Sequence, residues 1–379
     1  MSCGCNKIES FRKVAELTIV PSYSCPFDCK YCFVKENETL TKKIMTRETV
    51  DAIIDYFIPE KINKTFTLWF FGGEPLSDKE IIKYTTEKAQ KAAQQHGVQL
   101  TVGATTNGFY LDENFVKWCK ENNFQLLISY DGHENQRIFR GREGSRERDA
   151  VIVENNIRRC GNLLKTAAVQ LSPGGLANLY NNVMTVFDLG FPGIAMNKIT
   201  GKPGVYSEKD FNDLEREMGK LTEFVKKEQA SGGKRRVEFL QKQLDFLCDT
   251  SFLAKRIFQH DKSCGAAKGS LSISPTGNLY PCQRLHFPGF KLGNVHTEVM
   301  RVAKREKLAR HHPSGCQSCE VKCAPCYASN YESGRNIYNI SSDECRYERL
   351  LYQAAKKIID YQEGEKKNEQ ELQESRGST

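Results

Sequence analysis

Residues 18–33 read TIVPSYSCPFDCKYCF and place three cysteines, Cys25, Cys29 and Cys32, on one short segment. The apolar residues 17–20 just before them favour a β-strand, so the cysteines are expected on the loop that follows it. Three thiolates this close together can ligate three irons of a [4Fe-4S] cluster, which leaves one iron open to a small molecule. The alternatives are a zinc loop or scattered core cysteines. Zinc sites usually have four ligands in Cys-x2-Cys pairs, often with His, and no His lies nearby.

The spacing Cys-x3-Cys-x-aromatic-Cys, with Tyr31 as the aromatic residue, resembles the signature of radical S-adenosylmethionine (SAM) enzymes. The resemblance implies that the open iron binds the amino and carboxylate groups of SAM. One electron from the cluster then cleaves SAM to a 5′-deoxyadenosyl radical, which removes a hydrogen atom from the substrate. It further implies that Cys25, Cys29 and Cys32 form the catalytic centre, and that Tyr31 and the backbone at Phe33 lie near the adenine.

The composition suits a cytosolic enzyme. The chain has 379 residues, of which 39% are hydrophobic and 27% are charged, enough for a barrel with an appended domain. No apolar run approaches the ~18 residues of a membrane span. The N-terminus, MSCGCNKIES, has no apolar signal segment, so we predict a cytoplasmic protein with no membrane partner. Fifteen cysteines then indicate a reducing compartment and metal or catalytic use, although Cys3 and Cys5 are interpreted as spare thiols.

The formal net charge of +8 raises the question of a nucleic-acid partner. A [4Fe-4S] cluster with four cysteine thiolates carries a charge of about −2, and one with three carries about −1. Three clusters would therefore lower the net charge by about 4 to 6. The chain also shows no known nucleic-acid-binding module, and nucleic acid is therefore not expected as a partner.

From Glu16 onward, short β-prone segments alternate with amphipathic helical segments, which favours a parallel sheet with crossover helices. The predicted strands are 17–20, 65–71, 99–105, 125–130, 165–171 and 192–198, and the predicted helices are 47–57, 79–95, 112–122, 149–160 and 176–189. About six such units predict an α/β fold, a partial (β/α)6 TIM-like barrel, with its site at the carboxyl ends of the strands.

The predicted organisation has five parts. Residues 1–15 are a polar extension, 16–205 the radical SAM partial barrel, 206–255 a charged helical linker, 256–350 a cysteine-rich domain, and 351–379 the end of a helix with a tail. The tail from Gln362 to Thr379 is rich in Glu, Lys and Gln and is predicted to be disordered.

Three polar turns follow predicted strands. They are Gly72-Gly73-Glu74-Pro75, Thr106-Asn107-Gly108 and Ser129-Tyr130-Asp131-Gly132, and each is also compatible with a plain turn. The family resemblance implies that Gly72, Gly73 and Glu74 hold the amino group of SAM. It adds Thr106 and Asn107 as cofactor contacts, and it gives Ser129 and Arg140 contacts to the methionine carboxylate or the ribose. Many relatives have His-Asp ahead of that Arg; here residues 136–140 read QRIFR, and Arg142 is a competing candidate.

A second group of seven cysteines falls within 82 residues: Cys264, Cys282, Cys316, Cys319, Cys323, Cys326 and Cys345. A pair of zinc knuckles is the alternative. The segment 277–282 (GNLYPC) and the lone Cys345 resemble the SPASM domain of peptide-modifying radical enzymes, which holds two auxiliary [4Fe-4S] clusters. The resemblance implies that Cys264, Cys282 and Cys326 bind auxiliary cluster I, and that Cys316, Cys319, Cys323 and Cys345 bind auxiliary cluster II.

Some relatives have a further cysteine between the first two positions of this array, and this chain has none. Auxiliary cluster I is therefore expected either to be open or to be closed by His260, Asp261 or a substrate thiolate.

The resemblance covers residues 17–346 and implies a SAM-dependent, peptide-modifying oxidoreductase, or maturase, with three [4Fe-4S] clusters and a peptide or protein substrate. A thioether or other crosslink in a ribosomally made peptide fits best. It also implies a flavodoxin- or ferredoxin-type electron donor, and the short N-terminal extension suggests that a separate protein binds the leader peptide. Formylglycine formation is an alternative, but relatives that carry it out have Asp where this chain has Gln283, which is a poor base. A non-catalytic iron–sulfur carrier or scaffold is the other alternative.

Overall fold

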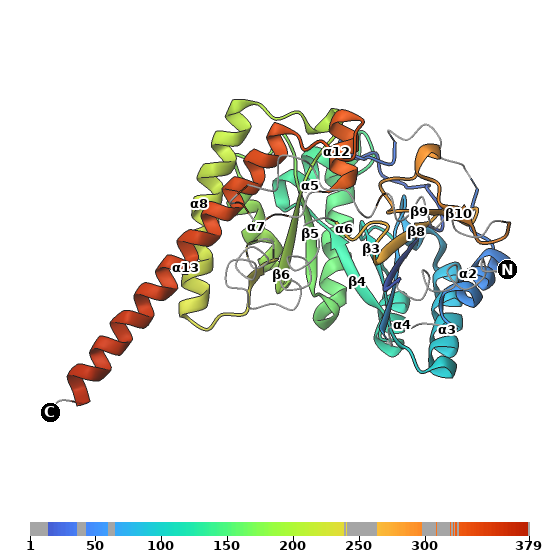
Figure 1. The fold of residues 1–379 in the computed structure, drawn as a ribbon, viewed down its shortest axis with the longest axis horizontal. Helices are drawn as coiled ribbons and strands as arrows, with labels where there is room; N and C mark the ends of the chain where they lie inside the picture. The colour runs from blue at the N-terminus through green and yellow to red at the C-terminus, as the bar shows by residue number, and fades with distance from the viewer. Residues whose placement is uncertain are drawn as a thin grey trace, which may run out of the picture. The chain divides into compact units, whose positions relative to one another are not determined.

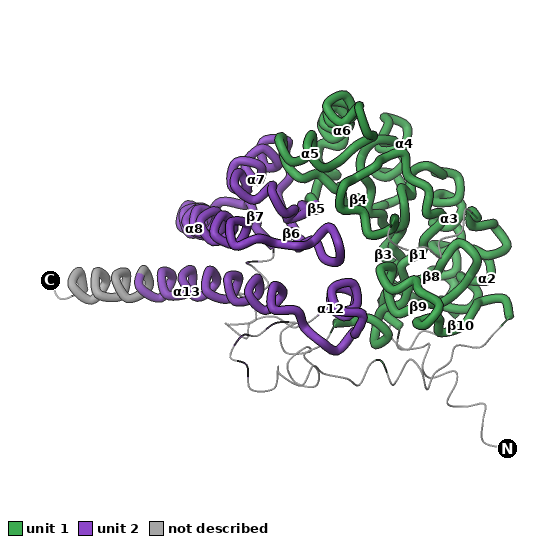
Figure 2. The backbone as a smooth tube through the Cα atoms, turned by 90° about the horizontal axis from the view of Figure 1, so that it is seen from above, with its two compact units in different colours: residues 1–167, 264–311 green, residues 168–263, 312–379 purple. Residues whose placement is uncertain are grey.

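A computed structural model describes residues 14–35, 43–59, 65–238, 240, 264–297, 308, 319, 321, 323 and 326–377 (Figure 1). The chain forms two compact units (Figure 2). The first contains residues 1–167 and 264–311, and the second contains residues 168–263 and 312–379. The cysteine-rich segment, for which the sequence predicted one domain at 256–350, is therefore divided between the units.

The first unit contains the first four predicted strands as a parallel sheet. They are β1 (Glu16–Ile19), β2 (Thr65–Phe70), β3 (Gln99–Thr106) and β4 (Gln125–Ser129), paired in chain order. The helices are α2 (Arg47–Phe57), α3 (Lys79–His96), α4 (Glu113–Glu121), α5 (His133–Phe139) and α6 (Arg146–Cys160). All except the short α5 were predicted. Crossover helices return the chain to the same end of the sheet, so consecutive strands pair in parallel.

The sequence pattern explains the core of this unit. On β2, Phe66, Leu68 and Phe70 are buried and alternate with more exposed residues, as in a strand that packs one face on the core. Helix α2 begins after Thr46, whose side chain accepts a hydrogen bond from the Thr49 backbone, as a helix N-cap does. The buried face of α2 contains Ile53, among other apolar residues at helical spacing.

Strand β8 (Ser270–Ile273) pairs in parallel with β1 on the side away from β2, in the register Glu16 to Ser270 and Ile19 to Ile273. Strands β9 (Asn278–Tyr280) and β10 (Gly293–Asn294) continue the sheet in antiparallel order. The order within this unit is thus β10-β9-β8-β1-β2-β3-β4. As a result, one strand, β8, separates the strand that leads to Cys25 (β1) from the strand that leads to Cys282 (β9).

The second unit contains most of β5 (Thr166–Leu171), together with β6 (Gly193–Lys198) and β7 (Arg236–Val237), of which β6 and β7 pair in parallel. Its helices are α7 (Leu179–Asp188), α8 (Glu208–Ala230), α12 (Tyr327–Gly334) and α13 (Ser342–Gly377). Four short 3-10 helices complete the two units: Pro75–Asp78, Gly161–Leu163, Lys202–Gly204 and Pro288–Phe290.

Two segments of the second unit differ from the sequence prediction. Helix α8, expected as part of a linker, buries an apolar face that includes Phe211, Leu214 and Leu221, and it packs against α7 and α13. Helix α13 continues to Gly377, where the sequence predicted a disordered tail. Glu, Lys and Gln favour helices, so the charged composition that suggested disorder also permits a helix that begins on a packed segment. No helix in the described ranges combines the length and the apolar composition that crossing a bilayer requires.

Candidate functional site

The three-cysteine loop, residues 20–33, leaves β1 at its carboxyl end. Cys29 and Cys32 are half-buried and Cys25 is exposed. Burial raises the pKa of Cys32 above its ordinary value, and the neighbouring Cys29 thiol adds to this shift. Cys25 also interacts electrostatically with Cys29 and Cys32, so the three sulfurs lie near one another. A raised pKa is unfavourable for a nucleophile, whereas a bound cation would displace the thiol protons and hold the cysteines as thiolates.

One side of this loop is held by the turn after β2. The backbone N–H of Gly73 donates to the Ser22 carbonyl at 3.0 Å, and that of Glu74 donates to the Ser24 carbonyl at 2.9 Å. A Cβ at Gly73 would collide with the carbonyl oxygens of Tyr23 and Ser24. The absence of a side chain at Gly73 therefore lets this turn approach the loop closely.

The other side of the loop is held by the connection from α5 to α6. The backbone N–H of Asp28 donates to the Gly141 carbonyl, and that of Lys30 donates to the Phe139 carbonyl, both at 2.9 Å. The Arg146 guanidinium adds a 3.2 Å bond to the Asp28 carbonyl. The loop is therefore fixed by backbone bonds to two separate turns, both at the carboxyl edge of the sheet.

The carboxylate of Glu74 joins two strand ends. It is 1% exposed and accepts hydrogen bonds from the backbone of Leu76 at 2.9 Å, the hydroxyl of Thr106 at 2.7 Å and the backbone of Asn107 at 2.7 Å. Burial raises the pKa of Glu74, and these three bonds oppose the shift. The Glu74 carboxylate is therefore bound by the protein's own donors, and it joins the turn after β2 to the turn after β3, which carries Asn107.

Asn107 stabilises its own turn and also contacts the three-cysteine loop. Its side-chain oxygen accepts from the backbone of Phe109 at 2.9 Å, which is a local turn bond. Its side-chain nitrogen lies 3.6 Å from the sulfur of Cys25. The two interpretations of residues 106–108, plain turn and site residue, are thus compatible.

Tyr31 forms a buried polar cluster with Asp131 and Arg140. Its hydroxyl donates to the Asp131 carboxylate and accepts from Arg140 Nη1 at 2.7 Å. Asp131 is fully buried and Arg140 is 6% exposed. Among the side chains that the structure describes, Arg140 Nε has no hydrogen-bond partner. Arg142, the competing candidate, is paired instead with Asp149 at 2.5 Å.

The sequence motif at residues 129–132 placed Asp131 only in a turn and did not predict it as a site residue. Its position directly after a strand, beside Ser129, was the available signal. Ser129 itself ends β4 and is half-buried.

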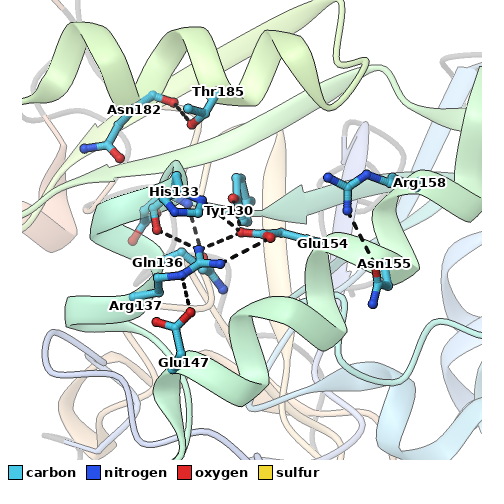
Figure 3. A network of polar contacts seen from close by, with 11 residues as sticks. Tyr130, His133, Gln136, Arg137, Glu147, Glu154, Asn155, Arg158, Asn182 and Thr185 are labelled. Carbon is cyan, nitrogen blue, oxygen red and sulfur yellow. Dashed lines mark hydrogen bonds and ion pairs between the residues drawn. The ribbon is translucent and has the colours of Figure 1, made fainter.

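The position of Asp131 is fixed by its neighbour Tyr130, which belongs to a network between α5 and α6 (Figure 3). The Tyr130 hydroxyl donates to Glu154 at 2.8 Å, and Arg137 donates to the same carboxylate at 2.7 Å. Arg137 also donates to Glu147 at 2.8 Å. Both helices are therefore tied to the end of β4, and Arg137 has a structural role in this network.

The second cysteine group is described in part. In the first unit, the segments of Cys264 and Cys282 adjoin, because the Ala267 backbone donates to the Pro281 carbonyl at 3.3 Å. In the second unit, Cys326 precedes α12, Cys345 lies in the first turn of α13, and Cys319 interacts electrostatically with Cys345. Cys3, Cys5, Cys316, His260 and Asp261 lie outside the described residues. Cys119 and Cys160 are fully buried, as is typical of structural thiols.

Comparison with known families identifies two domains in the chain. Residues 19–170 match the Radical SAM superfamily, and residues 264–327 match SPASM, an iron–sulfur cluster-binding domain. The radical SAM cyclopropyl synthase TigE of Paramaledivibacter caminithermalis is 22% identical, over 73% of this chain and 59% of the relative. A serine-type anaerobic sulfatase-maturating enzyme of Bacteroides thetaiotaomicron is 24% identical, over 84% of this chain and 82% of the relative.

Solved structures show the same fold. The structure of anSMEcpe with bound AdoMet has a TM-score of 0.71 at 18% identity and covers 91% of this chain and 94% of its own. SuiB of Streptococcus suis bound to its precursor peptide SuiA has a TM-score of 0.60 at 14% identity, over 90% of this chain and 78% of its own. The α/β fold predicted from the sequence is thereby confirmed.

The cofactor prediction is confirmed at the level of the domains. A radical SAM domain binds a [4Fe-4S] cluster and SAM, and a SPASM domain binds auxiliary iron–sulfur clusters. The donor set of the loop fits the first of these groups, because three neighbouring thiols are supported by a glycine turn on one side and a buried arginine on the other. The chain therefore contains a radical SAM domain, which a SPASM iron–sulfur cluster-binding domain follows.

Proposed function

We propose that this enzyme oxidises a peptide or protein substrate and forms a crosslink, a thioether or a C–C or C–O bond, in a ribosomally made peptide. The observation that carries the proposal is the three-cysteine loop held between the Gly73 turn and the Arg140 cluster, in a chain that also has the SPASM cysteines. Relatives support a peptide substrate, because SuiB is known bound to a precursor peptide and sulfatase-maturating enzymes act on proteins.

In this proposal Cys25, Cys29 and Cys32 hold the first cluster, which when bound supplies the one-electron cleavage of SAM. The backbone of residues 72–74 takes the amino group of SAM. Arg140, with its unpaired Nε among the described side chains, takes the methionine carboxylate and leaves Arg142 to its pair with Asp149. Ser129, at the end of β4, would contact the ribose, and Tyr31 and the backbone at Phe33 would contact the adenine.

The SPASM cysteines hold the auxiliary clusters in this proposal. Cys264, Cys282 and Cys326 are the ligands of cluster I, and Cys316, Cys319, Cys323 and Cys345 are those of cluster II. Loss of a hydrogen atom from the substrate leaves a carbon radical. Crosslinking then requires that one more electron and one proton leave the substrate, and an auxiliary cluster held by these cysteines would accept the electron. A flavodoxin- or ferredoxin-type donor and a separate leader-binding protein belong to this proposal as partners.

Formylglycine formation in a sulfatase is the second candidate. It is favoured by the sulfatase-maturating relative, of which this chain covers 82%. It is disfavoured by Gln283, which follows Cys282 and cannot act as a proton acceptor at neutral pH.

Anaerobic reconstitution with iron and sulfide, followed by SAM and dithionite, tests the proposal. We expect 5′-deoxyadenosine from the native chain and none from Cys29→Ala; equal yields from the two would contradict it. Co-expression with a short peptide encoded beside the gene then separates the two functions by mass spectrometry. A crosslink removes two hydrogens from the peptide, whereas a sulfatase peptide would gain an aldehyde that reacts with hydrazides.

A further inference from the structure

The segment that follows Cys282 contacts the three-cysteine loop near both ends of its cysteine run. The Tyr23 hydroxyl lies 2.5 Å from His286 Nδ1, and the Arg284 guanidinium lies over the Phe33 ring at 5.8 Å. Tyr23 is two residues before Cys25, and Phe33 directly follows Cys32. All of these residues belong to the first compact unit.

His286 is a rigid partner in the first contact. Its side chain is almost fully buried, and its Nε2 lies 2.8 Å from the Ser272 hydroxyl on β8. The Tyr280 ring stacks on it at 4.4 Å. Burial lowers the pKa of His286 to about 3, so at neutral pH the ring has one donor and one acceptor nitrogen. The Tyr23 and Ser272 hydroxyls therefore each bond one ring nitrogen, one hydroxyl as donor and the other as acceptor.

The second contact also leads to a part of the site. Phe33 stacks on Phe71 at 6.0 Å, and Phe71 directly precedes the Gly72 turn that supports the loop. Arg284 therefore acts on the ring that connects the end of the loop to the end of β2. Stacking of a guanidinium on an aromatic ring favours one orientation of both groups.

We propose that Tyr23–His286 and Phe33–Arg284 form a two-point clamp through which the segment after Cys282 positions the three-cysteine loop. The clamp couples the ligand segment of auxiliary cluster I to that of the first cluster, an assignment of ligands that rests on the proposed function. His286 and Arg284 are positioning residues in it. When Cys282 is held by a cluster, Arg284 and His286 keep their contacts with the loop. When Cys282 is not held, both contacts weaken.

Hydrogen–deuterium exchange of the full chain measures the clamp without any assay of activity. Peptides that contain Asp28 and Lys30 report on the loop, since both amides are bonded to the turn at residues 139–141. In Tyr23→Phe and His286→Leu we expect these amides to exchange about fivefold faster, as loss of one buried hydrogen bond predicts. His286→Gln, which keeps a donor and an acceptor, should restore most of the protection.

Tyr84→Phe is the matched control, because its hydroxyl donates to Asp51 at 2.7 Å between α2 and α3, away from the loop. It should leave the loop amides unchanged. Unchanged loop exchange in both Tyr23→Phe and His286→Leu would overturn the clamp. The SAM concentration that half-saturates the change in the cluster's EPR spectrum should also rise in these two variants.

Coupling is tested by combining variants in the reconstituted protein. Cys282→Ala should speed loop exchange in the native background and add little in the Tyr23→Phe background, whereas additive effects would overturn the coupling. If the native loop binds no iron, the proposed function fails, but Tyr23→Phe in the metal-free chain still shows whether the clamp exists.

Discussion

The Thr106 hydroxyl donates a 2.7 Å hydrogen bond to the Glu74 carboxylate and so joins the carboxyl end of β3 to that of β2. Two backbone donors complete the coordination of the same carboxylate. The turns that hold the three-cysteine loop and Asn107 are thereby fixed relative to each other by one buried anion.

Replacement of Glu74 by Gln should destabilise the protein, because an amide group would face a backbone or hydroxyl donor. We expect a loss of about 1–3 kcal/mol in the free energy of unfolding, measured by urea denaturation under anaerobic conditions. Glu80→Gln is the control, since Glu80 is exposed and pairs with Lys83 on the surface. That substitution should change stability by less than about 0.5 kcal/mol. Equal effects of the two substitutions would contradict the role of Glu74.

Gly73→Ala should displace the three-cysteine loop, because the new Cβ would meet the carbonyl oxygens of Tyr23 and Ser24. We expect reduced iron content and a SAM cleavage rate lower by about tenfold or more, as for a small misplacement of reacting groups. Iron analysis and the yield of 5′-deoxyadenosine measure this.

The control for Gly73→Ala is Gly219→Ala in α8, where no atom lies within 4 Å of the added Cβ. That change should stabilise the helix by about 0.5–1 kcal/mol and leave iron binding intact. Normal iron content in Gly73→Ala would show that the loop can move away from the turn without loss of function.

Arg140→Lys should weaken SAM binding, because lysine cannot both donate to Tyr31 and present a planar fork to a carboxylate. We expect the half-saturating SAM concentration in the EPR titration to rise about tenfold, the factor that corresponds to ~1.4 kcal/mol. The control is Arg142→Lys, because the Arg142 side chain is bonded to Asp149. It should change the half-saturating SAM concentration by less than about twofold. The reverse ranking would assign the carboxylate to Arg142.

The stability contributed by His286 should depend on pH. Burial lowers its pKa from 6.5 to about 3, so between these values the unfolded chain binds a proton that the folded protein does not. This contribution is fully present above pH 6.5 and is lost as the pH falls towards 3. We expect the stability difference between the native protein and His286→Gln to shrink by about 1 kcal/mol from pH 7.5 to 5.5. His96→Gln, at the exposed end of α3, is the control, and a pH-independent difference would reject the buried neutral ring.

The sequence predicted the strands and most helices because their apolar periodicity is strong and local. It missed α5, which is only one to two turns long, and it predicted disorder where α13 is helical. The site was predicted to the level of residue types. It did not predict that Asp131 and Arg140 would both bond to Tyr31, because residues 31, 131 and 140 are brought together only by the folded sheet.

The sequence by itself determined the chemistry, because cysteine spacing on one loop depends only on local chain geometry and on the ligands that iron prefers. The tertiary structure decided which donors bind the Glu74 carboxylate and which arginine adjoins the loop. It also placed one strand, β8, between the strand that leads to Cys25 and the strand that leads to Cys282. These relations depend on strand pairing between residues that are far apart in the chain. Local sequence patterns cannot specify such pairing, because many pairings satisfy the same periodicity.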